Sequence, residues 1–367
     1  MLYSILFIFY VIFAILIERA NIKSDNNKKI YVLLSFIVVT FMVGLRSYSA
    51  WADSGVYAFS FQNAPLLKDF SFKETPVGYR EKGFYLLTSC IKTIKNNTHF
   101  FFLTVSGLSF FFLYKFNRAY CLFPILAFAV YMARFLAGRN NMQIRAGLAI
   151  PLVLFLGTKF VHEKKLLKFL ITIFLGYCLH HSMIIALPLY LANYFKLQKA
   201  HVIIGLLLAF IVAIWGGNTI KHLMSSSSFI QDLARSYIND DSIKKYSATL
   251  ANPMIYYQCC FLLLFTIYEK KLRNYVKCYD LIRFGYFYST VLLIVLYDYA
   301  IVAGRTSTIF ATYEMVIVPS LILAFRGISQ KIYLCVLVVL YSFFFIQNWK
   351  PIQLSDMEVQ QAIQIDR

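Results

Sequence analysis

The chain has 367 residues, of which 60% are hydrophobic and only 14% are charged, and its net charge is +19. Soluble domains carry about 25% charged residues, so this composition excludes a soluble globular domain and predicts a polytopic α-helical membrane protein. The positive charge does not indicate nucleic-acid binding, because much of it falls in short loops where membrane topology accounts for it.

Twelve apolar runs follow one another along the chain and predict an all-α fold with ten to twelve transmembrane helices. The first run lacks the basic start and the small-residue cleavage site of a signal peptide, so we expect it to be a span. The sixth and seventh runs are short for a bilayer that needs about 20 residues, and they can instead form one long span or a re-entrant pair. The runs cover residues 2–18, 30–47, 98–114, 119–137, 146–160, 166–179, 183–196, 200–216, 252–268, 281–299, 308–326 and 331–348.

The distribution of Lys and Arg predicts the orientation of these spans. With the N-terminus outside, all the inside loops are short and basic, and the long polar segments 48–97 and 217–250 lie on the outer side. We expect a single transmembrane domain over residues 1–350 and a polar tail over 351–367. The predicted inside loops are 19–29, 115–118, 159–168, 196–201, 269–283 and 326–331.

Charged and aromatic residues cluster where the second run ends. Arg46 and Asp53 bracket a turn-prone stretch, Tyr57 follows, and Glu81 stands just before an apolar-aromatic sequence. These residues are candidates for contacts with a polar ligand. The alternative is a span end with interfacial aromatic residues and snorkelling charges.

Three arginines, Arg134, Arg139 and Arg145, stand between two apolar runs with no acidic neighbour in sequence. A charge near the bilayer centre costs roughly 2.5–3.5 kcal/mol on insertion scales, so it is usually paired with an opposite charge or belongs to a functional site. The planar guanidinium of arginine can donate two parallel hydrogen bonds to phosphate oxygens. On α-helical spacing, Arg139 and Gln143 share a face. The cluster predicts an anion pocket, and the alternative is a set of loop cations that snorkel to water.

Two histidines and a serine interrupt apolar sequence on the same predicted outer side. Histidine titrates near neutrality and can accept a proton from a sugar hydroxyl, so we expect His181 to be a catalytic base, with His180 as the second candidate. Ser182 would orient the ring or cap the next helix. The alternative is a polar side chain satisfied by a neighbouring helix.

The last third of the chain adds Arg305 to the candidate anion pocket. Glu314 lies inside an apolar run and is expected to pair with an arginine. The segment 217–250 is predicted to form a cap in which Tyr237, Asp240 and Asp241 contact a polar ligand, or else a solvated loop.

The order of these motifs resembles the EpsG family of Wzy-like bacterial polysaccharide polymerases. The family often has Gln directly after the arginine of the fifth run, where this chain has Ala146, and the doubled histidine leaves the register at that motif open. The matching motifs are Gly44-Leu45-Arg46, Asp53 with Tyr57, Glu81-Lys82-Gly83-Phe84, Arg139 to Arg145 with Ala149, Leu179-His180-His181-Ser182-Met183, and Arg305 with Tyr313 and Pro319.

The resemblance implies a multi-pass glycosyltransferase of the bacterial inner membrane with its active site facing the periplasm or exterior. Its substrates would be oligosaccharide repeat units on undecaprenyl diphosphate, joined into O-antigen, capsule or exopolysaccharide. We expect no cofactor, since arginines can stabilise the leaving diphosphate without a metal. The expected partners are the lipid-linked oligosaccharide, the bilayer and a chain-length regulator, with no nucleic acid.

The candidate residues then divide by role. His181 is the expected base. The expected diphosphate ligands are Arg139, Arg145, Arg305 and Arg46. The residues expected to orient the acceptor or to pair with arginines are Asp53, Glu81, Gln143 and Tyr57.

Two other functions can use the same residues. A flippase for the same lipid-linked units also needs arginines and about twelve spans, but the sequence has no clear internal repeat. A membrane acyltransferase that modifies glycans can use His181, but it needs an acyl-donor site on the inner side, where the sequence has no histidine cluster and His162 stands alone in a Lys-rich loop.

Overall fold

The structure is a computed structural model that describes residues 2–19, 25–47, 51–73, 81–216 and 249–349. Every regular element in these ranges is helical, which confirms the predicted all-α class, and each predicted apolar run falls on helix. Most of the segment 217–250, with Tyr237, Asp240 and Asp241, lies outside the described residues, as does the tail 351–367.

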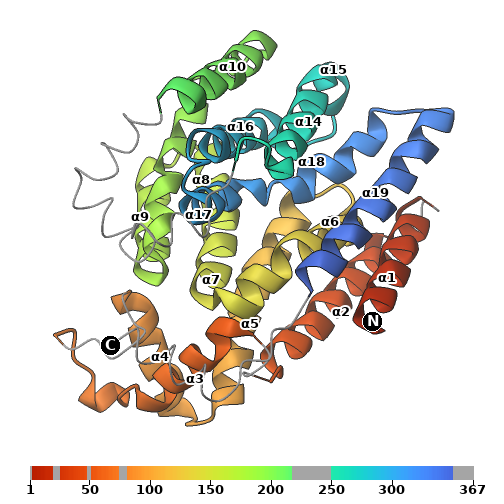
Figure 1. Cartoon of the computed structure of the whole chain (residues 1–367). Coiled ribbons are helices and arrows are strands. Elements are labelled where there is room, and N and C mark those ends of the chain that lie inside the picture. The colour runs from red at the N-terminus through yellow and green to blue at the C-terminus, as the bar shows by residue number, and fades with distance from the viewer. Residues whose placement is uncertain (1, 20–24, 48–50, 74–80, 217–248, 350–367) are drawn as a thin grey trace.

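The first helices of the chain pack against the last one, on the right-hand side of Figure 1. These helices are α1 (Leu2–Arg19), α2 (Asp25–Gly44), α5 (Thr98–Tyr120), α6 (Pro124–Tyr131) and α19 (Gly327–Asn348). Between α1 and α19, Phe7 stacks on Phe345 with ring centroids 4.1 Å apart. Between α2 and α6, Phe36 stacks on Phe128 at 3.9 Å. Aromatic contacts therefore close the two ends of the chain onto each other.

The segment 48–97, predicted as a long loop, contains a small helical layer at the lower end of Figure 1. It comprises α3 (Ala52–Asn63), the 3-10 turn η2 (Leu67–Asp69) and α4 (Lys82–Ile94). The layer has its own apolar cluster, in which Phe61 stacks on Phe101 of α5 at 4.8 Å. The sequence analysis did not identify these helices, because they are too short and too polar to register as apolar runs.

Stretches of π-helix interrupt the segment that carries the central arginines. The π-helix η3 (Met132–Met142) continues α6, and the backbone then leaves helical geometry at Gln143 with φ −97° and ψ 62°. The chain restarts as α7 (Ile144–Leu152), followed by the π-helix η4 (Val153–Gly157) and α8 (Thr158–His162). The α-helical spacing that placed Arg139 and Gln143 on one face does not apply here. π-helical turns are rare and occur frequently at functional sites.

The sixth and seventh apolar runs form a hairpin. The helix α9 (Leu166–Leu179) ends at His180, whose extended backbone (φ −158°, ψ 118°) begins the 3-10 helix η5 (His181–Asn193). Phe169 near the start of α9 lies 5.4 Å from Tyr190 near the end of η5, measured between ring centroids. The two elements therefore run antiparallel, which excludes one long span for this segment.

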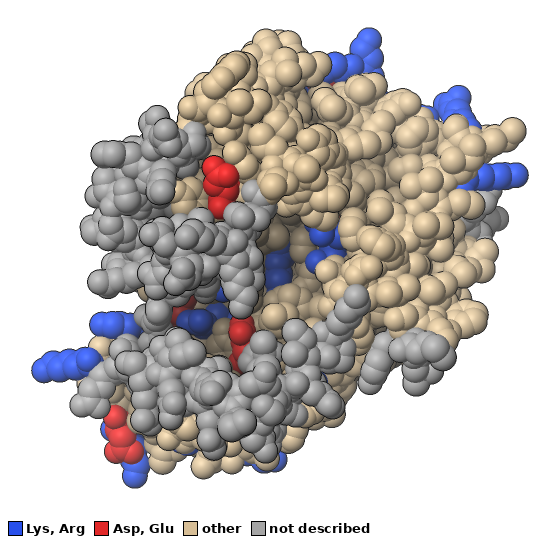
Figure 2. Space-filling view, viewed as in Figure 1, with Lys and Arg blue, Asp and Glu red and all other residues tan. Residues whose placement is uncertain are grey.

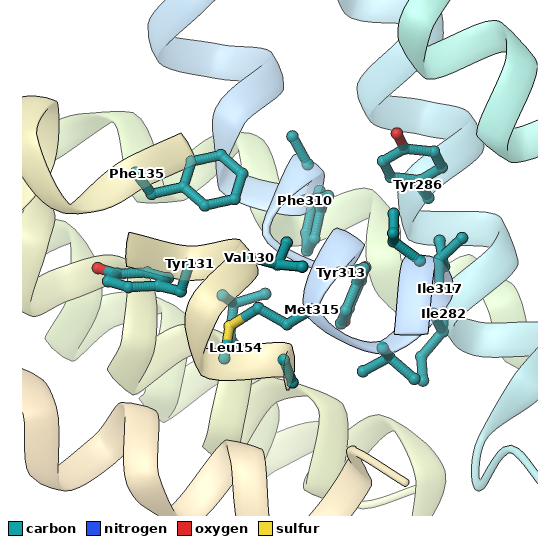
Figure 3. Packing of buried hydrophobic residues seen from close by; sticks show 14 of the residues in the cluster. Val130, Tyr131, Phe135, Leu154, Ile282, Tyr286, Phe310, Tyr313, Met315 and Ile317 are labelled. Carbon is teal, nitrogen blue, oxygen red and sulfur yellow. The ribbon is translucent and has the colours of Figure 1, made fainter. Parts of the chain in front are cut away.

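The C-terminal helices surround α16 (Tyr279–Val295), which contacts α10, α14, α17 and η5. The other helices of this part are α10 (Lys199–Trp215), α14 (Pro253–Ile267), α15 (Glu269–Leu272), α17 (Ala300–Ala311), α18 (Glu314–Ser320) and the 3-10 turn η6 (Leu321–Leu323). The axis bends by 55° between α17 and α18. Figure 3 shows that Phe310 and Tyr313, at this bend, fill the centre of the core between α6 and α16.

Three described helical segments are long and apolar enough to cross a membrane: 98–120, 144–162 and 327–348. The bent pair 302–311 and 314–323 can form a fourth. Five more apolar helices have 10–17 residues. The helices thus fit a membrane protein.

Described residues from several predicted inside loops lie close together at the end of the molecule that carries α15 in Figure 1. Lys277 lies 5.5 Å above the ring of Tyr120, and Lys199 donates a 3.3 Å hydrogen bond to the carbonyl of Ile267. We call this the α15 end. The opposite end carries α3 and α4, and we call it the α4 end.

Candidate functional site

Arg145 and Glu81 form the charged centre of the α4 end. The Arg145 guanidinium donates from Nε to the hydroxyl of Tyr57 at 3.1 Å and from Nη1 to the carboxylate of Glu81. Glu81 is buried, whereas 23% of the Arg145 side chain is exposed. No hydrogen bond occupies the Nη2 atom of Arg145 within the described ranges. The arginine is therefore held on one edge and accessible on the other.

A close helix contact positions Glu81, which is the N-cap of α4. A Cβ atom added at Gly83 would lie 2.6 Å from the Cβ of Cys178, so only glycine lets α4 approach the end of α9 this closely. Burial raises the pKa of the Glu81 carboxyl, but Arg145, His180 and His181 together lower it further, so that pKa lies below its ordinary value. The carboxylate is ionised and faces both the arginine and the histidine turn.

The histidine turn holds its two rings in different ways. Nδ1 of His180 accepts from the backbone N–H of Ser182 at 3.3 Å and lies 2.7 Å from the Ser182 hydroxyl. His181 is half-buried and stacks on Tyr177, with ring centroids 4.7 Å apart. Ser182 therefore orients the ring of His180, and Tyr177 supports the ring of His181.

Charges from three helices converge on this turn. Glu81 of α4, Arg145 of α7 and Arg305 of α17 all act electrostatically on the ring of His180. The helix α17 also contacts η5 directly. Figure 2 shows basic side chains deep in a hollow of the face it draws, with acidic atoms beside them. Residues far apart in sequence thus form one site.

Arg139 is buried and points toward α17. Its Nη1 donates to the hydroxyl of Thr312 at 2.5 Å, and its Nη2 donates to the carbonyl of Thr308. Its guanidinium carbon also lies 4.4 Å from the ring centroid of Phe135. These contacts tie the π-helical segment η3 to α17.

Arg46 is bonded mainly to backbone. Its guanidinium donates to the carbonyl of Val43 at 2.6 Å, the carbonyl of Asn141 at 3.2 Å and the hydroxyl of Ser54 at 3.2 Å. The Ser54 hydroxyl donates to the same Asn141 carbonyl at 2.8 Å. This arginine joins the end of α2 to α3 and to the break after η3.

Arg134 lies in a separate polar cage. Its Nε lies 3.1 Å from the carboxylate of Glu314, which also accepts from the hydroxyls of Tyr257 at 3.2 Å and Tyr286 at 3.3 Å. The prediction that Glu314 pairs with an arginine is confirmed. The three central arginines have no acidic neighbour in sequence, but two of them pair with glutamates in the structure, Arg134 with Glu314 and Arg145 with Glu81.

The remaining predicted residues lie on the edges of the site. Asp53 is in the first turn of α3, where its charge favours the positive end of the helix dipole. Gln143 occupies the break between η3 and α7. No three His, Cys, Asp or Glu side chains lie close enough to hold a metal ion in the part of the chain that the structure describes.

Comparison with known proteins gives one decisive match: the model of the EpsG family covers residues 29–358. The chain belongs to the EpsG family. Comparisons with curated proteins and with solved structures gave no match. Membership in the EpsG family indicates a polymerase-like role in polysaccharide biosynthesis, and the apolar helices fit a membrane protein.

Several residues of the motifs named above are far apart in sequence and lie together at the α4 end, whereas Tyr313 of the last motif lies in the core beside Thr158. The contacts that connect them come from residues that the sequence gave no reason to select: Ser54, Tyr177, Thr308 and Thr312. Each is an ordinary polar or aromatic residue within a helix, and its importance depends on a partner from another element.

Proposed function

We propose that this protein joins oligosaccharide repeat units carried on undecaprenyl diphosphate into a polysaccharide at the outer face of the bacterial inner membrane. The observation that carries the proposal is the convergence of Arg145, Arg305 and Glu81 on the histidine turn at 180–182. This arrangement offers cations for a leaving diphosphate and imidazoles for a sugar hydroxyl.

Arg145 and Arg305 are the proposed diphosphate ligands. Arg145 fits this role because its side chain is partly exposed while Tyr57 and Glu81 hold its guanidinium in place. Arg139 and Arg46 fit a positioning role better, since their donors bond to protein groups. A preorganised guanidinium stabilises the charge that develops on the leaving phosphate without reorganising.

The two histidines are proposed to divide the proton chemistry. Because Nδ1 of neutral His180 accepts a hydrogen bond, its proton lies on Nε2, and the ring is a donor suited to a phosphate oxygen. His181 has no such bond and is the proposed base. The acceptor hydroxyl gives its proton to His181 and its oxygen bonds to the anomeric carbon. The bond from that carbon to the diphosphate breaks, and the diphosphate keeps the electron pair.

The proposed topology has ten to twelve spans, with the N-terminus and the α4 end outside. It rests on the basic loops that gather at the α15 end. A chain-length regulator is not part of the proposal, because no contact or match points to one.

The test is a gel profile of surface glycan from a strain lacking the gene and from strains complemented with single variants. We expect single repeats instead of a ladder in the deletion strain and with His181→Gln. We expect His180→Gln to retain a partial ladder, since the glutamine amide can replace an Nε2 donor. General bases contribute roughly 100- to 10,000-fold to a rate.

The other outcomes are equally informative. Complete loss of surface repeats in the deletion strain would indicate that the protein is a flippase and not a polymerase. An unchanged ladder would exclude polymerisation. A full ladder with His181→Gln and none with His180→Gln would reverse the assignment of base and donor.

A further inference from the structure

Two adjoining cavities lie at the α15 end, far from the histidine turn. The first has a volume of about 280 Å³ and lies between α1, α6, η6 and α19. The second has a volume of about 270 Å³ and lies beside the start of α19. Leu323 and Gln330 line both cavities, so the two are adjacent at these residues.

The first cavity is mostly apolar. Its walls include the side chains of Ile15, Phe123, Leu126 and Leu334. Its acidic residue is Glu18, whose carboxylate accepts from the backbone N–H groups of α6 at Ile125 (2.7 Å) and Leu126 (3.4 Å). This carboxylate caps the start of α6, where a negative charge is stabilised by the helix dipole. The cavity therefore suits a hydrocarbon chain.

The second cavity is basic. Lys271 and Arg326 line it together with Tyr275 and the backbone of Gly327. The Lys271 ammonium uses one donor on the carbonyl of Ala324 at 3.2 Å and keeps two. Arg326 is exposed at its rim.

Neighbouring cations at this end are neutralised, in contrast to these two. Arg273 and Arg283 form ion pairs with Glu269 and Asp280 at distances of 2.5–3.2 Å. Among the residues that the structure describes, no carboxylate pairs with Lys271 or Arg326. The second cavity thus concentrates positive charge that the protein does not balance.

We propose that the paired cavities bind one anionic phospholipid. Its phosphate lies between Lys271 and Arg326, and an acyl chain enters the apolar cavity past Leu323. Basic pockets beside membrane helices recognise anionic head groups in this way, and an uncharged or zwitterionic head group leaves the two cations uncompensated. The site is independent of the proposed polymerase chemistry at the α4 end.

The test uses the full chain purified in a mild detergent and titrated with phosphatidylglycerol or phosphatidylcholine of identical acyl chains, with bound lipid counted by native mass spectrometry. We expect phosphatidylglycerol to bind tighter by roughly tenfold or more, because each cation near the membrane surface contributes about 1 kcal/mol to binding of an anionic head group. Lys271→Gln with Arg326→Gln should abolish this preference. The matched control is Lys159→Gln with Lys168→Gln, two exposed lysines away from both cavities, and it should keep the preference.

Two further arms test the apolar half and the source of the phosphate. Glycerophosphoglycerol, which has the head group without acyl chains, should not displace the lipid at equal concentration. Displacement by that compound would reduce the site to a phosphate pocket and overturn the proposal. Equal binding of both lipids would also overturn it, as would equal loss of preference in the control variant.

Discussion

Two of the arginine–glutamate pairs in the described residues, Arg134 with Glu314 and Arg145 with Glu81, differ in what surrounds them. The Arg134 guanidinium carbon lies 5.0–5.2 Å from the ring centroids of Phe135, Tyr257 and Phe344, and Glu314 is fully buried. Each oxygen of that carboxylate accepts a hydrogen bond from a tyrosine hydroxyl. The pair formed by Arg145 and Glu81 has one tyrosine, a partly exposed arginine and two histidines nearby.

The difference separates a structural pair from a functional one. In the Arg134 pair every strong bonding direction of the carboxylate is used within the protein, so nothing is left for a ligand. In the Arg145 pair the arginine keeps an accessible edge next to imidazoles. The first pair should therefore determine stability, and the second should determine activity.

The largest expected effect is a loss of stability when the pair formed by Arg134 and Glu314 is broken. Glu314→Gln leaves Arg134 buried without a counter-charge, and breaking such a pair costs about 3–5 kcal/mol. We expect lower protein levels and a lower Tm in detergent, with Glu81→Gln as the comparison that loses much less. A stable but inactive Glu314→Gln protein would contradict this prediction and would indicate that the pair formed by Arg134 and Glu314 takes part in catalysis.

Arg145→Ala should abolish polymer formation while the protein accumulates normally. Loss of one preorganised donor to a developing anion costs roughly 100- to 1,000-fold in rate. Arg145→Lys should not rescue, because an ammonium cannot hold Tyr57 and Glu81 and still offer a planar edge to phosphate. The readout is polymer amount and length, with Lys82→Ala, an exposed cation beside Glu81, as the control. Normal polymer with Arg145→Ala would remove this residue from the site.

Gly83→Ala should separate Glu81 from the histidine turn without removing a charge. The added methyl would lie 2.6 Å from Cys178, so α4 must shift, and displacements of about 1 Å can reduce rates by up to roughly 100-fold. The control is Gly107→Ala, where the nearest atom is 4.0 Å from the added Cβ. Equal polymer yields from both variants would mean that the close contact is only a packing feature.

The smallest expected effect is a pH dependence of stability. The pKa of Glu81 in the folded protein lies below its ordinary value, so the pair with Arg145 stabilises the fold at neutral pH and this contribution is lost as the pH falls through the folded pKa. As the pH falls from about 5 to below 4, the Tm of the wild type should fall more than that of Glu81→Gln. Parallel curves would show that Arg145 gains no stability from this carboxylate.

The amino-acid sequence by itself determined the helical class, the positions of the apolar runs and the family. These properties depend on local composition, because burying apolar helices in lipid requires only runs of suitable length. Described residues of several loops that the positive charge predicted on one side also lie close together, since Lys277 contacts Tyr120 and Lys199 contacts Ile267. The helices α3 and α4 were not predicted because neither forms a long apolar run, and the apolar residues of α4 cover one face only.

Only the tertiary structure decided which charges meet. Glu81 precedes Arg145 by 64 positions, and Glu314 follows Arg134 by 180, so no local pattern pairs them. The reversal at His180 and the orientation of its ring depend on backbone geometry and on one bond to Ser182. Burial makes an unpaired charge costly, so each arginine binds whichever acceptor the packing brings within reach, and packing is a property of the whole chain.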